Sequence, residues 1–218
     1  MNKSNLRVWA AWAGLLAPLL FVGVFTVEGS LRPGYDPLSM YISALSLGPR
    51  GPIQMTNFIV LGLLLLVFTL GLALEFPTGR GPRAGRILLT VVGGLFLISG
   101  PFVMDPTGTP VSQMTVHGTI HGLAGGFVFL LMPVIIFVYL GRFRRDPNWR
   151  GFYVWTLVLG IVEAGGVLFF TAVSKAPAAA AAFAPWMGLI QRCALIPFMF
   201  WQFLFAWRLL GRSRQAVQ

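Results

Sequence analysis

Six apolar stretches, each long enough to cross a bilayer, dominate this sequence. A transmembrane helix needs about 20 consecutive and predominantly apolar residues. The stretches comprise residues 8–28, 54–75, 86–104, 114–140, 152–173 and 187–210. Only 10% of the residues are charged, whereas a soluble domain carries about 25%. The sequence therefore predicts an all-α fold, in which residues 1–218 form a single polytopic bundle of six transmembrane helices.

Basic residues are divided unequally between the two sides of this predicted bundle. Twelve of the 16 Lys and Arg fall on one side, namely Lys3, Arg7, Arg80, Arg83, Arg86, Arg142, Arg144, Arg145, Arg150, Arg208, Arg212 and Arg214. Because cytoplasmic loops carry an excess of Lys and Arg, we expect both termini to be cytoplasmic. The net charge of +10 is therefore explained by the membrane topology of the chain. We therefore expect membrane lipids, and no nucleic acid, as partners.

The first outer loop, residues 29–53, is the longest connection and contains a helical pattern. Residues 37–47 predict a short helix with Leu38, Tyr41, Ile42 and Leu45 on one face and Ser39, Ser43 and Ser46 on another. An amphipathic helix of this kind lies at a membrane interface. We expect its apolar face to be shielded from water and its serine face to be accessible.

Ionisable side chains are predicted to gather in the outer half of the bundle. Such groups are costly inside a membrane and often mark functional sites. Ordered along the chain, they are Glu28, Asp105, His117, His121, Glu163 and Arg192. We expect a polar pocket that opens toward the outer leaflet, with Arg192 close to at least one of the other five. A simpler interpretation is that these groups end helices, shape turns or bond neighbouring helices.

The two histidines stand four residues apart, which places them on one face of a helix. With Asp105, His117 and His121 could bind one Zn²⁺. They could instead handle protons, bind a substrate or form interhelical hydrogen bonds. They cannot ligate opposite faces of one haem, and the chain has no further histidine, so an intramolecular bis-histidine haem is excluded. No other cofactor is indicated.

Four motifs resemble a family of bacterial membrane proteins described as domain of unknown function 998. The motifs are "RPGYDPLSMYISALSLGPRGPIQMTNF" (32–58), "GPFVMDPTGT" (100–109), "HGTIHG" (117–122) and "GLIQR" (188–192). The resemblance implies a multi-helix protein of the bacterial cytoplasmic membrane, without an established activity. It highlights Tyr35, Ser43, Asn57, Asp105, His117, His121 and Arg192.

A looser resemblance links the chain to transmembrane hydrolases related to alkaline ceramidases, which use histidines, an aspartate and a serine around zinc. Ser43, Asp105, His117 and His121 are similar to that set. Two features depart from it, because this chain has six predicted spans rather than seven and two histidines rather than three. A carboxylate would have to replace the missing ligand.

Three hypotheses about function remain open at this point. In the first, the protein binds or transports a lipid headgroup or small anionic molecule through Arg192, with His117, His121, Glu28, Tyr35 and Asn57 around it. In the second, it is a metal-dependent lipid hydrolase in which Asp105 or Glu163 acts as the base and Ser43 stabilises developing charge. In the third, it is a structural or assembly protein without chemistry. The sequence does not indicate an oligomeric state.

Overall fold

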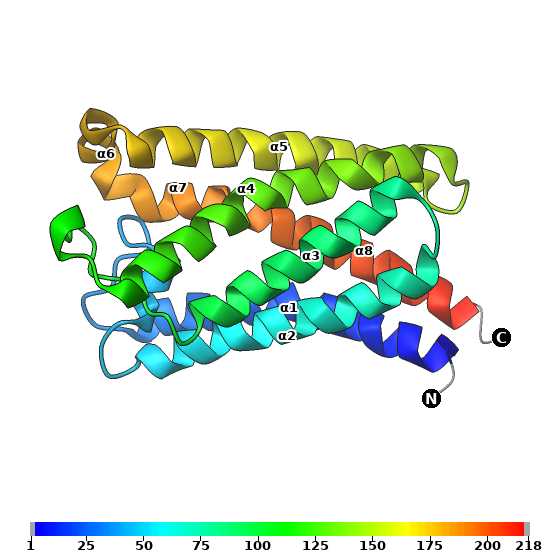
Figure 1. Cartoon of the computed structure of the whole chain (residues 1–218), viewed down its shortest axis with the longest axis horizontal. Helices are drawn as coiled ribbons and strands as arrows, with labels where there is room; N and C mark the ends of the chain where they lie inside the picture. Colours follow the sequence, from blue (N-terminus) through cyan, green and yellow to red (C-terminus); the bar gives the residue numbers. More distant parts are fainter. Residues whose placement is uncertain (1–2, 216–218) are drawn as a thin grey trace.

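The computed structural model describes residues 3–215 and consists of long helices arranged around a common axis (Figure 1). The long helices are α1 (Lys3–Leu31), α2 (Gly51–Glu75), α3 (Arg80–Ser99), α4 (Val116–Arg145), α5 (Arg150–Lys175) and α8 (Ile196–Gln215). Short elements are α6 (Pro177–Phe183), α7 (Met187–Cys193) and the 3₁₀ helices η1 (Ile42–Ser46), η2 (Val111–Gln113) and η3 (Ala184–Trp186). Within the described residues, six helical segments are long and apolar enough to cross a membrane. The prediction of an all-α, six-span bundle is confirmed.

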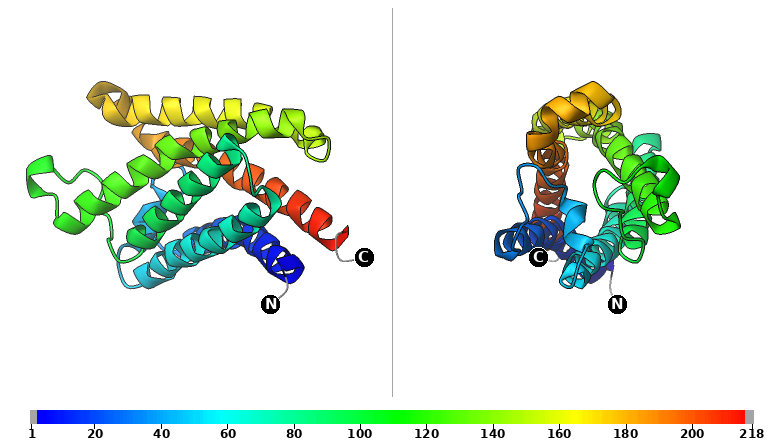
Figure 2. Two further views of the ribbon diagram at one scale, coloured as in Figure 1. Left: turned by 45° about the vertical axis from the view of Figure 1, so that its right-hand side comes forward. Right: turned by 90° about the vertical axis from the view of Figure 1, so that its left-hand side faces the viewer.

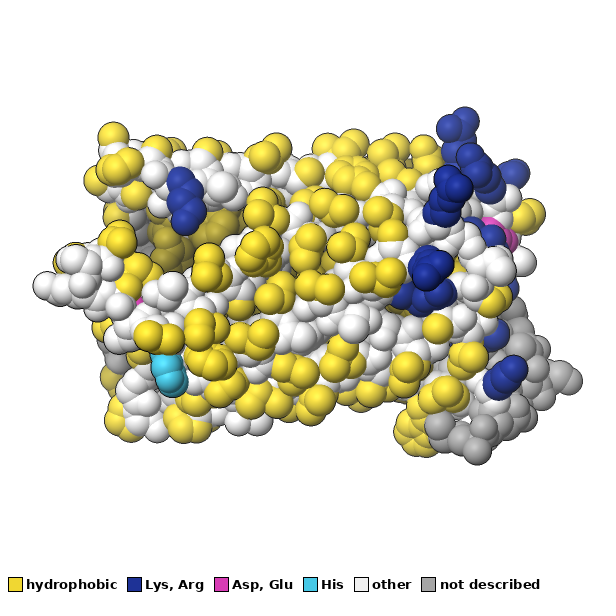
Figure 3. All heavy atoms as spheres, in the orientation of Figure 1, with side chains coloured by type: hydrophobic (Ala, Val, Ile, Leu, Met, Phe, Trp, Pro, Cys, Tyr) yellow, Lys and Arg dark blue, Asp and Glu magenta, His cyan; other side chains and the backbone are white. Residues whose placement is uncertain are grey.

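The long helices form a ring, which Figure 2 shows end-on. Each helix packs against the next along the chain, and contacts of α8 with α1 and α5 close the ring. The start of α1 and the end of α8 lie at the same end of the ring as the α2–α3 and α4–α5 connections (Figure 1). Basic side chains gather at this end (Figure 3), which we call the arginine-rich end. The distribution of basic residues thus follows the fold, and the cytoplasmic location of this end stays a prediction.

The ends of α3 differ from the prediction of residues 86–104. The helix begins at Arg80 and stops at Ser99, because Pro101 has no N–H to continue the helical hydrogen bonds. Asp105 therefore lies in the α3–α4 connection and not at the end of a span. At the arginine-rich end, α4 continues to Arg145, beyond its apolar stretch.

The last span is interrupted, whereas the sequence predicted one helix over residues 187–210. Helix α7 ends at Cys193, and α8 begins at Ile196. Pro197 cannot donate a backbone hydrogen bond. The next N–H, that of Phe198, bonds to the carboxyl group of Glu163 instead of to a helical carbonyl. A discontinuous helix can exist at membrane depth only when its backbone groups find such partners.

Glycine pairs in the spans serve two different purposes. A Cβ at Gly93 would lie 3.1–3.3 Å from Leu66 and Gly62, and one at Gly166 would lie 3.1 Å from the Cys193 carbonyl oxygen. These glycines permit close helix packing. Gly125 and Gly126 differ from Gly93 and Gly166, because a Cβ there would meet nothing within 4 Å.

The first outer loop folds over the end of the ring opposite the arginine-rich end. Its only helix within residues 32–50 is η1, which is shorter than the predicted 37–47. Ile42 donates its N–H to Gln191 Oε1 over 2.8 Å, which anchors the loop to α7. The expected accessibility is wrong at two positions, since Leu38 is 43% exposed and Ser46 only 4%. Contact with the ring, rather than an amphipathic face, decides burial here.

Aromatic side chains fill the arginine-rich half of the ring. The cluster consists of Phe76, Tyr139, Phe143, Trp149, Phe152, Trp201 and Phe205, all buried. Neighbouring ring centroids are 5.0 Å apart for Tyr139 and Phe205 and 5.2 Å for Phe143 and Trp149. Aromatic packing of this density leaves little free space. Any sizeable cavity inside the ring must therefore lie toward the opposite end.

Candidate functional site: a cavity between α4 and α5

A cavity of about 420 Å³ lies between α4 and α5. The two helices meet near their connection at the arginine-rich end and diverge toward the opposite end (Figures 1 and 2). Gly118, Gly122, Gly125 and Gly126 of α4 line the cavity. A Cβ at residues 122, 125 or 126 would meet nothing within 4 Å. Much of this space therefore exists because these glycines of α4 have no side chains to fill it.

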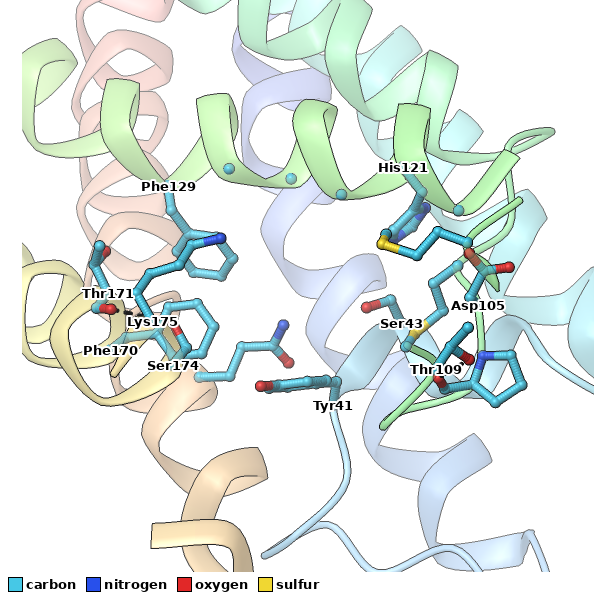
Figure 4. Close-up of a pocket in the computed structure, with 18 of the residues that line it drawn as sticks. Tyr41, Ser43, Asp105, Thr109, His121, Phe129, Phe170, Thr171, Ser174 and Lys175 are labelled. Carbon is cyan, nitrogen blue, oxygen red and sulfur yellow. Dashed lines mark hydrogen bonds between the residues drawn. The ribbon is translucent and has the colours of Figure 1, made fainter. Parts of the chain in front are cut away.

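The last turns of α5 form one wall of the cavity. Phe170, Thr171, Ser174 and Lys175 line it, and Lys175 is the only cationic lining residue. Figure 4 shows the Lys175 side chain reaching into the cavity alongside Phe170. Within residues 3–215, the side chain of Lys175 makes no hydrogen bond or ion pair. Its ammonium group is thus free to bind an anion.

Loops at the end opposite the arginine-rich end form the other walls. Tyr41, Ser43 and Thr109 line the cavity together with Gln191 of α7. Figure 4 shows the hydroxyl of Ser43 directed into the cavity. The ring of Tyr41 packs edge-on against Phe170, with centroids 6.2 Å apart, and burial raises the pKa of Tyr41. Hydroxyl and amide groups therefore face an otherwise largely apolar space.

His121 lies where the cavity continues into the ring. It lines both this cavity and a smaller one of about 60 Å³, as do Ser43 and Gln191. Its Nδ1 is 2.8 Å from the carbonyl oxygen of Phe102. Because a carbonyl oxygen only accepts, Nδ1 carries the proton in the neutral ring and Nε2 is the acceptor.

The structure does not bring the predicted zinc ligands together. His117 is exposed and lies against Phe102, with ring centroids 5.2 Å apart. The Asp105 carboxylate accepts hydrogen bonds from the N–H and the hydroxyl of Thr115, at 2.9 and 2.8 Å. Among residues 3–215, no three His, Cys, Asp or Glu side chains are grouped to hold a metal ion. Asp105 instead fixes the first turn of α4, where Gly118 leaves room for its carboxylate.

Arg192 holds the first outer loop against α7. Its Nη1 donates to the carbonyl oxygens of Pro37, Met40 and Gly188, at 2.8–3.1 Å. Its Nη2 donates to the Tyr35 hydroxyl over 2.6 Å. Burial raises the pKa of Tyr35, and no ion pair of Arg192 occurs in the described part of the chain. The expected anion site at Arg192 is therefore occupied by backbone carbonyls.

Three further candidate residues also bond within the protein. Glu28 is 3% exposed and forms ion pairs with Arg32 and Arg50, at 2.9 and 2.6 Å. Asn57 donates to the carbonyl oxygen of Phe21 over 3.1 Å and joins α2 to α1. Glu163 is fully buried at the break between α7 and α8. None of Glu28, Asn57 and Glu163 lines the cavity.

Sequence reasoning missed most of the residues that line the cavity. Two signals were nevertheless present in the sequence. Thr171, Ser174 and Lys175 share one helix face near the end of a span, at spacings of three and four. Gly118, Gly122, Gly125 and Gly126 share one face of α4 in the same way. The space beside these glycines, however, stays empty only because α5 diverges from α4, and a local sequence pattern does not reveal that divergence.

Six apolar helices of this length define the chain as a multi-pass membrane protein. Residues 15–208 match the family described as protein of unknown function (DUF998), and the chain belongs to this family. Comparison with curated proteins and with solved structures finds no match.

Proposed function

We propose that the protein binds a membrane lipid, or a similar amphiphile, in the cavity between α4 and α5. The observation that carries this proposal is the single unpaired cation, Lys175, in a largely apolar cavity between diverging helices. A volume of about 420 Å³ falls within the range of small-molecule sites, about 300–1,000 Å³. Lys175 would bind an anionic headgroup, and the glycine face of α4 would receive the apolar part.

A route from the bilayer supports a lipid rather than a water-soluble anion. Gly122 and Gly126 are exposed as well as lining the cavity. Next to them, Leu123 and Phe127 of α4 are 60% and 55% exposed, which suits lipid contact. An acyl chain could therefore enter between α4 and α5 without crossing water. By the positive-inside rule, this end of the ring faces the outside of a bacterial cytoplasmic membrane.

Binding or transport is favoured over hydrolysis by the positions of the candidate catalytic groups. Asp105 is bonded to Thr115, and neither His117 nor Glu163 lines the cavity. Ser43 and His121 remain as polar lining groups that can orient a bound headgroup. Arg192, Glu28 and Asn57 act in this proposal as supports of the loop and helices around the site.

Photocrosslinking tests the proposal in vesicles that contain the protein and phosphatidylglycerol with a diazirine in one acyl chain. We expect adducts on α4 residues 118–130. Gly126→Leu should fill the cavity and reduce these adducts, whereas Gly23→Leu should not, because Gly23 is also exposed but lies on α1. Lys175→Gln should weaken labelling and Lys175→Arg should retain it. Equal labelling of Gly126→Leu and Gly23→Leu proteins would contradict lipid binding in this cavity.

A further inference from the structure

A groove separate from the cavity between α4 and α5 lies at the arginine-rich end, between the start of α5 and the end of α8. It has a volume of about 610 Å³ and is lined by Asn148, Gly151, Trp155, Trp207, Arg208 and Arg212, among others. The aromatic cluster separates it from the cavity near Lys175, so the two sites are distinct. Its lining includes two arginines and no acidic residue.

The guanidinium group of Arg208 is held in a fixed position inside this groove. Its Nε and Nη2 both donate to the carbonyl oxygen of Asn148, at 3.3 and 2.7 Å. The group lies against Gly151, where a Cβ would be 3.5 Å from Nη1, an ordinary van der Waals contact. In residues 3–215, Nη1 itself has no hydrogen-bond acceptor. One donor of an oriented guanidinium group is thus left for a ligand.

Arg212 is oriented in a similar way, one helical turn further along α8. Its Nε donates to Glu75 Oε1 over 2.6 Å. The guanidinium groups of Arg208 and Arg212 lie 5.7 and 5.9 Å from the ring centroid of the buried Trp149. Neither Nη atom of Arg212 has an acceptor among the described residues. Since Glu75 also pairs with Arg7 at 3.1 Å, its charge does not neutralise these arginines.

The surroundings of the groove match the headgroup level of a membrane. Trp155 and Trp207 flank it and are 54% and 63% exposed, and tryptophan is enriched where hydrocarbon meets water. On the same helix as Trp155, Val154 and Val158 are 62% and 49% exposed. The polar groove therefore leads directly onto an apolar, lipid-facing surface.

We propose that this groove binds the phosphate group of an anionic phospholipid from the leaflet at the arginine-rich end. The free donors of Arg208 and Arg212 would hold the phosphate oxygens, since guanidinium groups bind phosphate with paired hydrogen bonds. The side-chain amide of Asn148, which makes no hydrogen bond within the described chain, would contribute a further donor. Acyl chains would lie against Trp155, Trp207 and the apolar face of α5. Basic pockets between transmembrane helices bind anionic lipids in this way.

A charge placed in the groove gives a direct test. Gly211 lines the groove and a Cβ there would meet nothing within 4 Å, so Gly211→Glu adds a carboxylate beside the arginines without a clash. Gly141→Glu is the matched control, because Gly141 is also exposed, open and near the arginine-rich end of its helix. Arg208→Gln removes one guanidinium group while keeping a polar side chain.

Native mass spectrometry measures the lipids that the purified protein retains from detergent solutions of phosphatidylglycerol or phosphatidylcholine. Gly126→Leu protein serves as the background, so that the cavity near Lys175 does not contribute. We expect a preference of about tenfold for phosphatidylglycerol, because the choline cation of phosphatidylcholine offsets its phosphate charge beside the two arginines. Gly211→Glu and Arg208→Gln should abolish it, and Gly141→Glu should keep it. Equal retention of both lipids, equal behaviour of the two glutamate variants, or full displacement by equimolar inorganic phosphate would overturn the proposal.

Discussion

Glu163 of α5 accepts a hydrogen bond from the N–H of Phe198 over 3.0 Å, and this bond joins α5 to the interruption between α7 and α8. Both residues are fully buried. The interruption frees the Phe198 N–H from the helical pattern, and a buried N–H without a partner is costly. The carboxyl group of Glu163 thus does for α8 what a capping side chain does for an ordinary helix start. This role explains an acidic residue in the middle of a span without an arginine beside it.

Substitution of Glu163 should separate hydrogen bonding from charge. Gln retains a carbonyl oxygen that can accept the Phe198 N–H, so Glu163→Gln should unfold close to the temperature of the unchanged protein. Glu163→Leu leaves the N–H without an acceptor and should cost about 1–3 kcal/mol of stability. Thermal unfolding in detergent, followed by tryptophan fluorescence, measures both. If the two variants lost the same stability, the hydrogen bond would not be the role of Glu163.

The ion pairs of Glu28 should contribute unequally to the stability of the outer loop. Arg32 is 13% exposed and also donates to the Leu47 carbonyl oxygen, whereas Arg50 is 48% exposed. Because solvent screens exposed pairs, Arg32→Ala should destabilise by about 1–3 kcal/mol and Arg50→Ala by less. Limited proteolysis of residues 32–50, together with thermal unfolding, gives the order. A larger effect for Arg50→Ala would contradict this account.

The loop tyrosines should make stability sensitive to high pH. Burial raises the pKa of Tyr35 and Tyr41 above the ordinary value of 10.0. The unfolded chain therefore loses these protons first, so their contribution is complete below about pH 10 and is lost as pH rises through the folded-state values. We expect the unfolding temperature to fall above that pH. The fall should be smaller in Tyr41→Phe protein, which keeps the ring contact with Phe170 but cannot ionise.

The sequence predicted the spans well because length and apolar composition alone decide whether a helix can cross a bilayer. It failed at the last span, where Pro197 was a visible signal of a break but the partner, Glu163, came from another helix. The candidate site shows the same limit. Arg192 was conspicuous in the sequence as a charged residue in a span. Its hydrogen-bond partner Pro37, however, is 155 residues away in the sequence. From the sequence, Lys175 was only a charged residue in a predicted loop. That its side chain lies unpaired in a cavity depends on how α4 and α5 diverge.

The last prediction concerns the orientation of the ring. Of the 16 Lys and Arg, the twelve named in the sequence analysis lie in the first turns of α1, in the last turns of α8, or in and beside the α2–α3 and α4–α5 connections. This end should therefore be cytoplasmic. Cys193 is the only cysteine and is exposed, so accessibility is measured in a Cys193→Ser background. Pro110→Cys lies in the exposed α3–α4 connection at the opposite end and should react with an impermeant maleimide in intact cells. Gly141→Cys, exposed near the end of α4, should react only after the cells are opened, and its labelling in intact cells would reverse the assignment of both proposed lipid sites to their leaflets.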